Sequence, residues 1–102
     1  MDNLLNMVLE AHNPERNHHR RYELMVGRDM FGAWMLTIRY GRVGSVGHIR
    51  HFSSTNPRDI QRIMRQSLHR RSGASRRIGC SYRLMSCSSS PKLDRTAWLP
   101  NM

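Results

Sequence analysis

Hydrophobic and polar side chains alternate along several stretches in the first half of the chain, which is the pattern of strands with one buried face. Residues 5–11 show this alternation, although their Leu and Met residues leave a helix as an alternative. Residues 21–28 resume it, and 34–40 show it most clearly because β-branched and aromatic residues dominate there. Residues 48–53 form the fourth predicted strand. The side chains expected on the buried faces of the first three strands are Leu5, Met7, Leu9, Ala11, Tyr22, Leu24, Val26, Trp34, Leu36, Ile38 and Tyr40.

Turn-forming residues separate these stretches. Asn13-Pro14 ends the first of them, and residues 15–19 are predicted to form a polar loop. Residues 29–32 form a predicted turn, in which Gly32 can adopt positive φ. Glycines then recur at every third position between the third and fourth strands, which predicts a tight, bulged hairpin. These glycines are Gly41, Gly44 and Gly47.

A helix is predicted to begin after the fourth strand. Asn56 can cap it, Pro57 suits its first turn, and Asp59 places a carboxylate near its positive N-terminus. An apolar stripe at helical spacing follows, formed by Ile60, Ile63, Met64 and Leu68. Ser72-Gly73 ends the helix, with Gly73 expected in the left-handed conformation.

The order of elements predicts an α+β fold, with an antiparallel sheet of about four to five strands and one α-helix packed on one face. A last strand is expected at about Cys80 to Met85. From Ser86 the sequence becomes rich in serine, which predicts a loose end. We therefore expect one domain over residues 1–85 and a Ser-rich C-terminal tail over residues 86–102.

Charge is the strongest compositional feature of the chain. Seventeen Lys and Arg residues face seven Asp and Glu residues, which gives a formal net charge of +10. Sixteen of the seventeen are arginines, whose planar guanidinium groups bind phosphate through paired hydrogen bonds. The cluster with no nearby acid is formed by Arg70, Arg71, Arg76 and Arg77. These four residues are the predicted phosphate contacts.

Other chemistries find less support in the sequence. His48 and His51 lack the third ligand that a metal site needs, and Cys80 and Cys87 form no close pair. We therefore expect no metal, no cofactor, no small-molecule substrate and no enzymatic activity. A metal-dependent nuclease that uses the two histidines is the remaining catalytic alternative. Two cysteines and no apolar leader or membrane-spanning segment favour a cytoplasmic protein with reduced thiols.

The segment from Phe31 to Gly44 resembles the signature of the WGR domain, which reads Phe-Gly-x-Trp, a strand, and then Trp-Gly-Arg-hydrophobic-Gly. The flanking sequence is also similar: a lead-in strand at 17–24, Phe52-Ser53-Ser54 before a helix, and a basic helix end followed by Gly79 and Tyr82. The resemblance covers roughly residues 7–84. Tyr40 replaces the motif tryptophan, and Gly79 and Tyr82 are separated where the family has them adjacent.

The resemblance implies an antiparallel sheet with one helix, as the pattern predicts. In poly(ADP-ribose) polymerases this domain contacts broken DNA: the motif tryptophan packs on the sugar at a strand end, and the motif arginine links DNA binding to neighbouring domains. These roles fall by motif match on Tyr40 and Arg42, with Gly41 between them. Stand-alone copies of the domain occur mainly in bacteria, and the resemblance implies a place at the nucleoid for this protein if it binds DNA.

The expected function is non-catalytic binding of nucleic acid, double-stranded or broken DNA, through backbone phosphates. The alternative is a protein-interaction module that docks a partner subunit through the Tyr-Gly-Arg hairpin, aided by Trp98 and Leu99. Two local points stay open. Tyr40 is either a core residue or an exposed platform, and Arg42 either is free for a ligand or pairs with Glu23 or Asp59.

Overall fold

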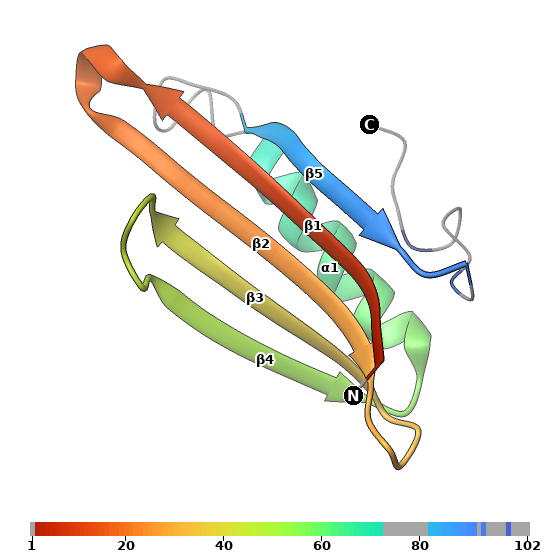
Figure 1. Ribbon diagram of the computed structural model, residues 1–102. Coiled ribbons are helices and arrows are strands. Elements are labelled where there is room, and N and C mark those ends of the chain that lie inside the picture. Colours follow the sequence, from red (N-terminus) through yellow and green to blue (C-terminus); the bar gives the residue numbers. More distant parts are fainter. Residues whose placement is uncertain (1, 73–81, 92, 94–97, 99–102) are drawn as a thin grey trace.

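The computed structural model describes residues 2–72, 82–91, 93 and 98. Within them, five antiparallel strands form one sheet of order β4-β3-β2-β1-β5, and helix α1 lies behind that sheet in Figure 1. The α+β fold predicted from the sequence is confirmed. The elements are β1 (Asp2–Asn13), the 3-10 turn η1 (Pro14–Arg16), β2 (His18–Arg28), β3 (Trp34–Arg42), β4 (His48–Ser54), α1 (Pro57–Ser72) and β5 (Arg83–Ser89).

The first alternating stretch is strand β1 and not a helix. It pairs with β2 over almost its full length, from Asp2 opposite Arg28 to Asn13 opposite His18. Strand β2 therefore begins three residues earlier than its alternation indicates, and His18 and His19 belong to the strand and not to the predicted polar loop. The reason is that backbone hydrogen bonds extend the ladder whatever the side chains are. The connection closes through η1 and through Asn17, which has a φ of 55°.

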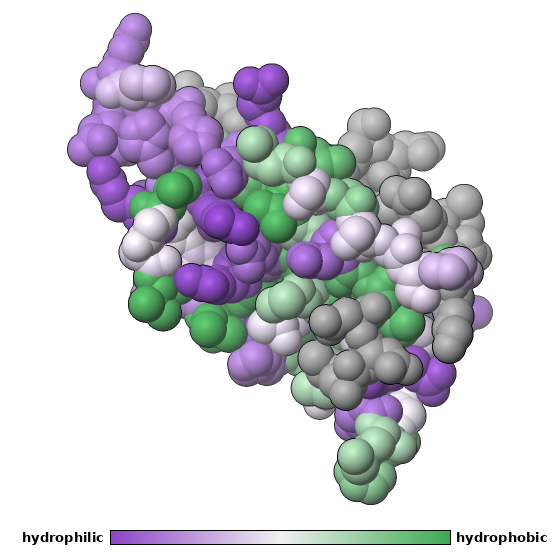
Figure 2. All heavy atoms as spheres, viewed as in Figure 1, coloured by the Kyte–Doolittle hydropathy of each residue, from purple (hydrophilic) through white to green (hydrophobic). Residues whose placement is uncertain are grey.

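The hydrophobic core lies between the sheet and α1. Alternate residues of β1, β2 and β3 point towards the helix, and Leu24, Leu36 and Ala11 are fully buried. The helix contributes its predicted stripe, in which Ile60 and Met64 are also fully buried. The opposite face of the sheet carries the polar half of each alternation, and Figure 2 shows hydrophilic and hydrophobic side chains mixed on it. The chain thus presents one covered and one open sheet face.

Strand β5 runs further into the Ser-rich sequence than predicted. It continues through Ser89, four residues beyond the expected end at Met85. Its backbone pairs with the edge of β1, from Leu5 opposite Ser89 to Glu10 opposite Arg83. Serine side chains do not prevent this because the ladder is made by backbone groups and the edge of β1 is available. Gly73 and Cys80, which were expected to end the helix and start this strand, lie outside the described residues.

Two residues of the expected tail contribute to the core. Leu93 is 6% exposed and Trp98 is 3% exposed, and both belong to the main hydrophobic cluster. The Trp98 ring lies 5.1 Å from the ring of Trp34, the half-buried first residue of β3. The guanidinium carbon of Arg28 lies 4.9 Å from the centre of the Trp34 ring. Leu93 and Trp98 therefore take part in packing.

Asn56 caps α1 as the sequence predicts. Its side-chain oxygen accepts a hydrogen bond from the backbone N–H of Arg58 at 3.0 Å. Ser54 reinforces this end of the helix, because its hydroxyl accepts from the backbone N–H of Asn56 and donates to Asp59. The cap satisfies one of the backbone donors that the first helical turn leaves without a partner.

Replacing Asn56 by Ala is expected to lower the free energy of unfolding by about 1 kcal/mol, because the donor of Arg58 loses its partner. Urea denaturation followed by circular dichroism measures this change. Asn6→Ala is the matched control, since Asn6 is an exposed strand residue on the open face, and its effect is expected to stay within about 0.5 kcal/mol. Equal losses in the two variants would contradict the capping role.

Candidate nucleic-acid interface

The hairpin that joins β3 to β4 carries the Tyr-Gly-Arg motif at its first corner. Ser45 closes the turn: its backbone N–H and its hydroxyl both donate to the carbonyl oxygen of Arg42, at 3.1 and 2.7 Å. The side chain of Arg39 crosses the loop and donates from Nε to the carbonyl oxygen of Val46 at 3.0 Å. The loop is therefore braced from both sides and holds Arg42 in a defined place.

Glycine is required at the far corner of this hairpin. Gly47 has a φ of +70°, and a Cβ atom there would lie 2.4 Å from the carbonyl oxygen of Tyr40. Gly44 also has positive φ, +86°, but its missing Cβ would meet nothing within 4 Å. Gly41 faces Gly47 across the hairpin, and a Cβ on it would lie 2.8 Å from the Gly47 Cα. The predicted hairpin with glycines at 41, 44 and 47 is confirmed, but the bulge expected with it is not found in the pairing of β3 with β4, which runs without a register shift.

Tyr40 is half-buried in a cross-strand row of rings. It stands directly opposite Tyr22 of β2 and His48 of β4, with ring centres 6.2 and 5.4 Å away. The ring packs against the edge of the core on the face of the sheet that α1 covers. Tyr40 is therefore neither a full core residue nor a free platform: its inner part packs, and its outer part lies at the surface.

Arg71, in the last turn of α1, lies over this row of rings. Its guanidinium carbon is 4.3 Å from the centre of the Tyr22 ring, 5.7 Å from that of Tyr40 and 5.9 Å from that of Tyr82. The Nε atom is fully buried and has no hydrogen-bond partner among the described residues. The three aromatic rings favour a cation here, and so does the negative end of the helix dipole. Arg71 thus holds the end of α1 on the sheet.

A small pocket opens beside the hairpin. It has a volume of about 210 Å³ and includes three arginines and one carboxylate among its lining residues: Arg21, Arg39, Arg42 and Glu23. Gly41, which pairs with Arg21, also lines the pocket. Glu23 forms an ion pair with Arg21 at 2.7 Å, so one of the three positive charges is compensated. The pocket keeps a positive balance suited to an anion.

The family model of the WGR domain matches residues 5–75, well over half of the chain. This chain belongs to the WGR domain family. No curated protein matches it in a sequence comparison. WGR domains are modules that bind nucleic acid, and the matched region contains the whole hairpin and α1.

The WGR fold brings together predicted site residues that are far apart in the sequence. Tyr40, Gly41 and Arg42 meet the end of α1 because Arg71 lies over Tyr40. Arg70 is exposed beside Arg71 in the same helical turn. Arg76 and Arg77 lie outside the described residues, so their role as phosphate contacts stays a prediction. The surface around the hairpin and the end of α1 is the candidate interface of this WGR domain.

The two carboxylates considered as partners of Arg42 are engaged elsewhere. Glu23 pairs with Arg21, and Asp59 accepts from Ser54 and lies 3.6 Å from Arg62. Arg42 itself is exposed, and no ion pair is formed by it among the described residues. Its charge is therefore available to a ligand of the WGR domain.

Arg21 and Arg39 are residues that sequence reasoning missed. Both occupy the polar half of a strand alternation, and no binding role was predicted for them. Arg39 directly precedes Tyr40 in the sequence, and this was the available signal. Arg21 is opposite Gly41 on the neighbouring strand. Their contribution depends on the pairing of β2 with β3, which alternation alone does not define.

Histidines gather at the other hairpin of the WGR domain, between β1 and β2. The Nδ1 atoms of His12 and His19 are 2.8 Å apart, so one ring N–H donates to the other ring, and His12 Nε2 lies 2.8 Å from a carboxylate oxygen of Glu10. His48 and His51 are separate from this group and lie on β4. Across the described ranges, no group of three His, Cys, Asp or Glu residues could hold a metal ion.

Two further sequence expectations concern the thiols and membranes. Cys87 of β5 is half-buried and is a free thiol, while Cys80 lies outside the described residues. Among the helices that the structure describes, none has the length and apolar character needed to cross a membrane.

Proposed function

We propose that this WGR domain binds DNA without catalysing a reaction. The arginines around the β3–β4 hairpin and the end of α1 contact backbone phosphates, and the exposed part of Tyr40 packs against a strand end. The observation that carries the proposal is the exposed Arg42, held on a braced turn beside two further pocket arginines and with its expected carboxylate partners engaged elsewhere.

The chemistry of this surface fits a polyphosphate. Guanidinium groups donate paired hydrogen bonds to phosphate oxygens, and each bound phosphate releases counterions from the DNA. The net charge of +10 adds a long-range attraction that accelerates the encounter. Sequence-independent binding with a steep salt dependence follows from contacts of this kind.

Salt titration tests the proposal directly. Fluorescence anisotropy of labelled blunt, nicked and closed duplexes is expected to show binding at low salt. With about four phosphate contacts, the affinity falls about 100-fold between about 50 and 200 mM salt. Preference for blunt or nicked duplex over closed duplex supports the contact between Tyr40 and a strand end. Absence of binding at low salt contradicts the function itself.

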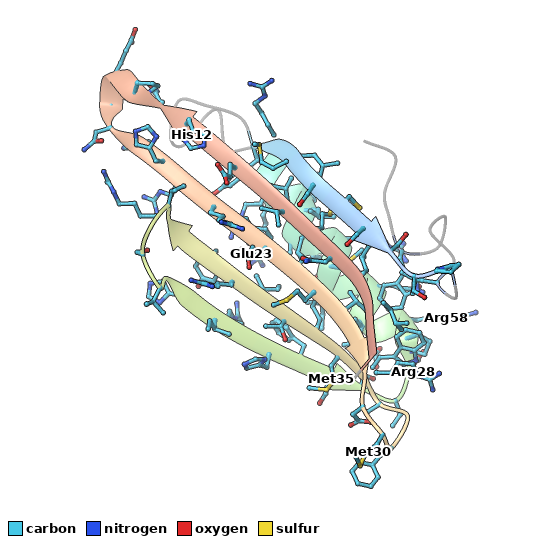
Figure 3. All side chains as sticks on the ribbon, in the orientation of Figure 1. His12, Glu23, Arg28, Met30, Met35 and Arg58 are labelled. Atoms are coloured by element: carbon cyan, nitrogen blue, oxygen red, sulfur yellow. The ribbon has the colours of Figure 1, made fainter. Side chains whose placement is uncertain are left out.

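A matched pair of charge reversals locates the interface. Arg42→Glu is expected to weaken duplex binding by at least about tenfold, because it removes a charged hydrogen bond and adds repulsion. Arg58→Glu makes the same charge change on an exposed residue at the opposite end of the molecule, as Figure 3 shows, and is expected to weaken binding less than about threefold. Equal losses in both variants would show that net charge alone decides binding. The double substitution Arg76→Glu/Arg77→Glu tests the remaining predicted contacts.

Docking of a protein partner through the same hairpin is the second candidate function. Val43 and Val46 expose apolar side chains there, with 38% and 73% of their surfaces accessible. Trp98, which the sequence offered as support for docking, is buried in the core, and Leu99 lies outside the described residues. A partner retained in a pull-down after nuclease treatment and high salt favours docking, and loss of the partner under both conditions contradicts it.

A further inference from the structure

Two arginines stand directly opposite each other beside the Tyr-Gly-Arg corner. The pairing of β2 with β3 places Arg20 opposite Arg42, and both side chains are exposed. Side chains of directly opposed residues on an antiparallel pair have Cβ atoms about 5 Å apart. Because faces alternate every second residue, this arginine pair lies on the same sheet face as Tyr22 and Tyr40, one step closer to the end of the sheet.

The nearest strand carboxylates do not compensate this pair. Glu10 and Glu23 are opposite Arg21 and Arg39 in the ladders and therefore belong to the open face of the sheet, although Glu23 and Arg42 both line the pocket beside the hairpin. Figure 3 shows Glu23 on that face, towards the viewer. Within the described residues, Glu10 contacts His12 and Glu23 contacts Arg21. Arg20 and Arg42 form no ion pair within the same part of the chain.

Like charges that face each other across a strand pair destabilise the sheet. Arg71, whose guanidinium lies over Tyr22 and Tyr40, adds a third positive charge on the same face. An anion placed between opposed guanidinium groups removes this repulsion and accepts hydrogen bonds from both. The arrangement is therefore unfavourable in the free protein and favourable in the presence of a phosphate.

We propose that Arg20 and Arg42 together bind one phosphate group, so that Arg20 is a binding residue of this domain. The proposal rests on the proposed DNA-binding function, in which the phosphate belongs to the nucleic-acid backbone. Arg20 lies outside the Tyr-Gly-Arg motif and outside the basic cluster at the end of α1, and only the register of β2 against β3 brings it to the site.

The pair predicts opposite effects of one substitution on stability and on binding. Arg20→Gln removes the repulsion, and is expected to raise the thermal unfolding midpoint of the free protein by about 1–4 °C at low salt. The same variant is expected to bind duplex DNA about tenfold more weakly, with the slope of log affinity against log salt reduced by about 1. If Arg20 had a merely structural role, the variant would be less stable than the unaltered protein and the slope of log affinity against log salt would not change.

Arg65→Gln is the matched control, because Arg65 is an exposed arginine on α1 and its loss changes the net charge by the same amount. It is expected to leave the unfolding midpoint and the salt slope close to those of the unaltered protein. In the Arg20→Gln/Arg42→Gln double variant, the losses in duplex affinity are expected to be less than additive, because either substitution alone breaks the shared contact.

The experiment separates failure of the pair from failure of the function. Duplex binding that is equal in Arg20→Gln and Arg65→Gln, in a protein that otherwise binds DNA, overturns the role of Arg20. Absence of duplex binding in the unaltered protein overturns the DNA-binding function. In that case, inorganic phosphate tests whether the pair binds a free phosphate. If phosphate raises the thermal unfolding midpoint of the unaltered protein but not that of Arg20→Gln, the pair binds a free phosphate, and the assignment to a nucleic-acid backbone is wrong.

Discussion

Replacing Trp98 by Ala is expected to lower the free energy of unfolding by about 3–5 kcal/mol, although this residue lies in a segment that looks like a tail. The side chain is 3% exposed and belongs to the core cluster, with its ring 5.1 Å from that of Trp34. Its removal would take away a large apolar surface and leave a cavity beside Trp34. Urea denaturation followed by tryptophan fluorescence and circular dichroism measures the loss.

Phe31→Ala is the matched control for Trp98. Phe31 is also a large aromatic residue, but it is 88% exposed in the turn between β2 and β3. Figure 3 shows that turn projecting beyond the end of the sheet, at the labelled Met30. Its truncation is expected to change the free energy of unfolding by less than about 0.5 kcal/mol. If the two variants lose the same stability, or if neither loses any, the burial of Trp98 does not stabilise the fold.

Replacing Gly47 by Ala is expected to cost about 2–4 kcal/mol of stability and to weaken duplex binding at the same time. The new Cβ would lie 2.4 Å from the carbonyl oxygen of Tyr40, and the φ of +70° is unfavourable for any other L-residue. The backbone must therefore shift at the corner that positions Tyr40 and Arg42. Denaturation gives the first effect, and anisotropy with labelled duplex gives the second.

Gly44 offers the control within the same hairpin. Its φ is +86°, but an added Cβ would meet no atom within 4 Å, so Gly44→Ala carries only the conformational cost of about 1 kcal/mol. Duplex binding by Gly44→Ala is expected to stay close to that of the unaltered protein. Equal stability losses in Gly44→Ala and Gly47→Ala would show that the contact with Tyr40 relaxes without strain.

Arg71 changes how the basic end of α1 is understood. The sequence groups it with Arg70, Arg76 and Arg77 as a phosphate contact, whereas the structure places its guanidinium over three tyrosine rings with Nε buried. Substituting Arg71 would therefore disturb the packing of α1 on the sheet together with any contact to phosphate. Arg42 and Arg20 are better probes of binding, because both are exposed and neither holds two elements together.

Local sequence determined the elements of this WGR domain. Alternation predicts the strands because successive strand residues point to opposite faces, and it identifies Leu24 and Leu36 as core residues, both fully buried. The cap at Asn56 and the glycine corners of the hairpin are also local, since each depends on hydrogen bonds or backbone angles within a few residues. The motif identified Tyr40 and Arg42, and the excess of arginine indicated an anionic partner.

Only the tertiary structure decided which of these residues meet. Arg20 and Arg42 lie just outside the alternating stretches 21–28 and 34–40, and only the register of β2 against β3 places them opposite each other. The contact of Arg71 with Tyr40 and that of Trp98 with Trp34 join segments that no local pattern connects. Such contacts depend on how the whole chain closes around one core. The sequence therefore determines the charge and the elements, while pairing and packing determine the geometry of the site.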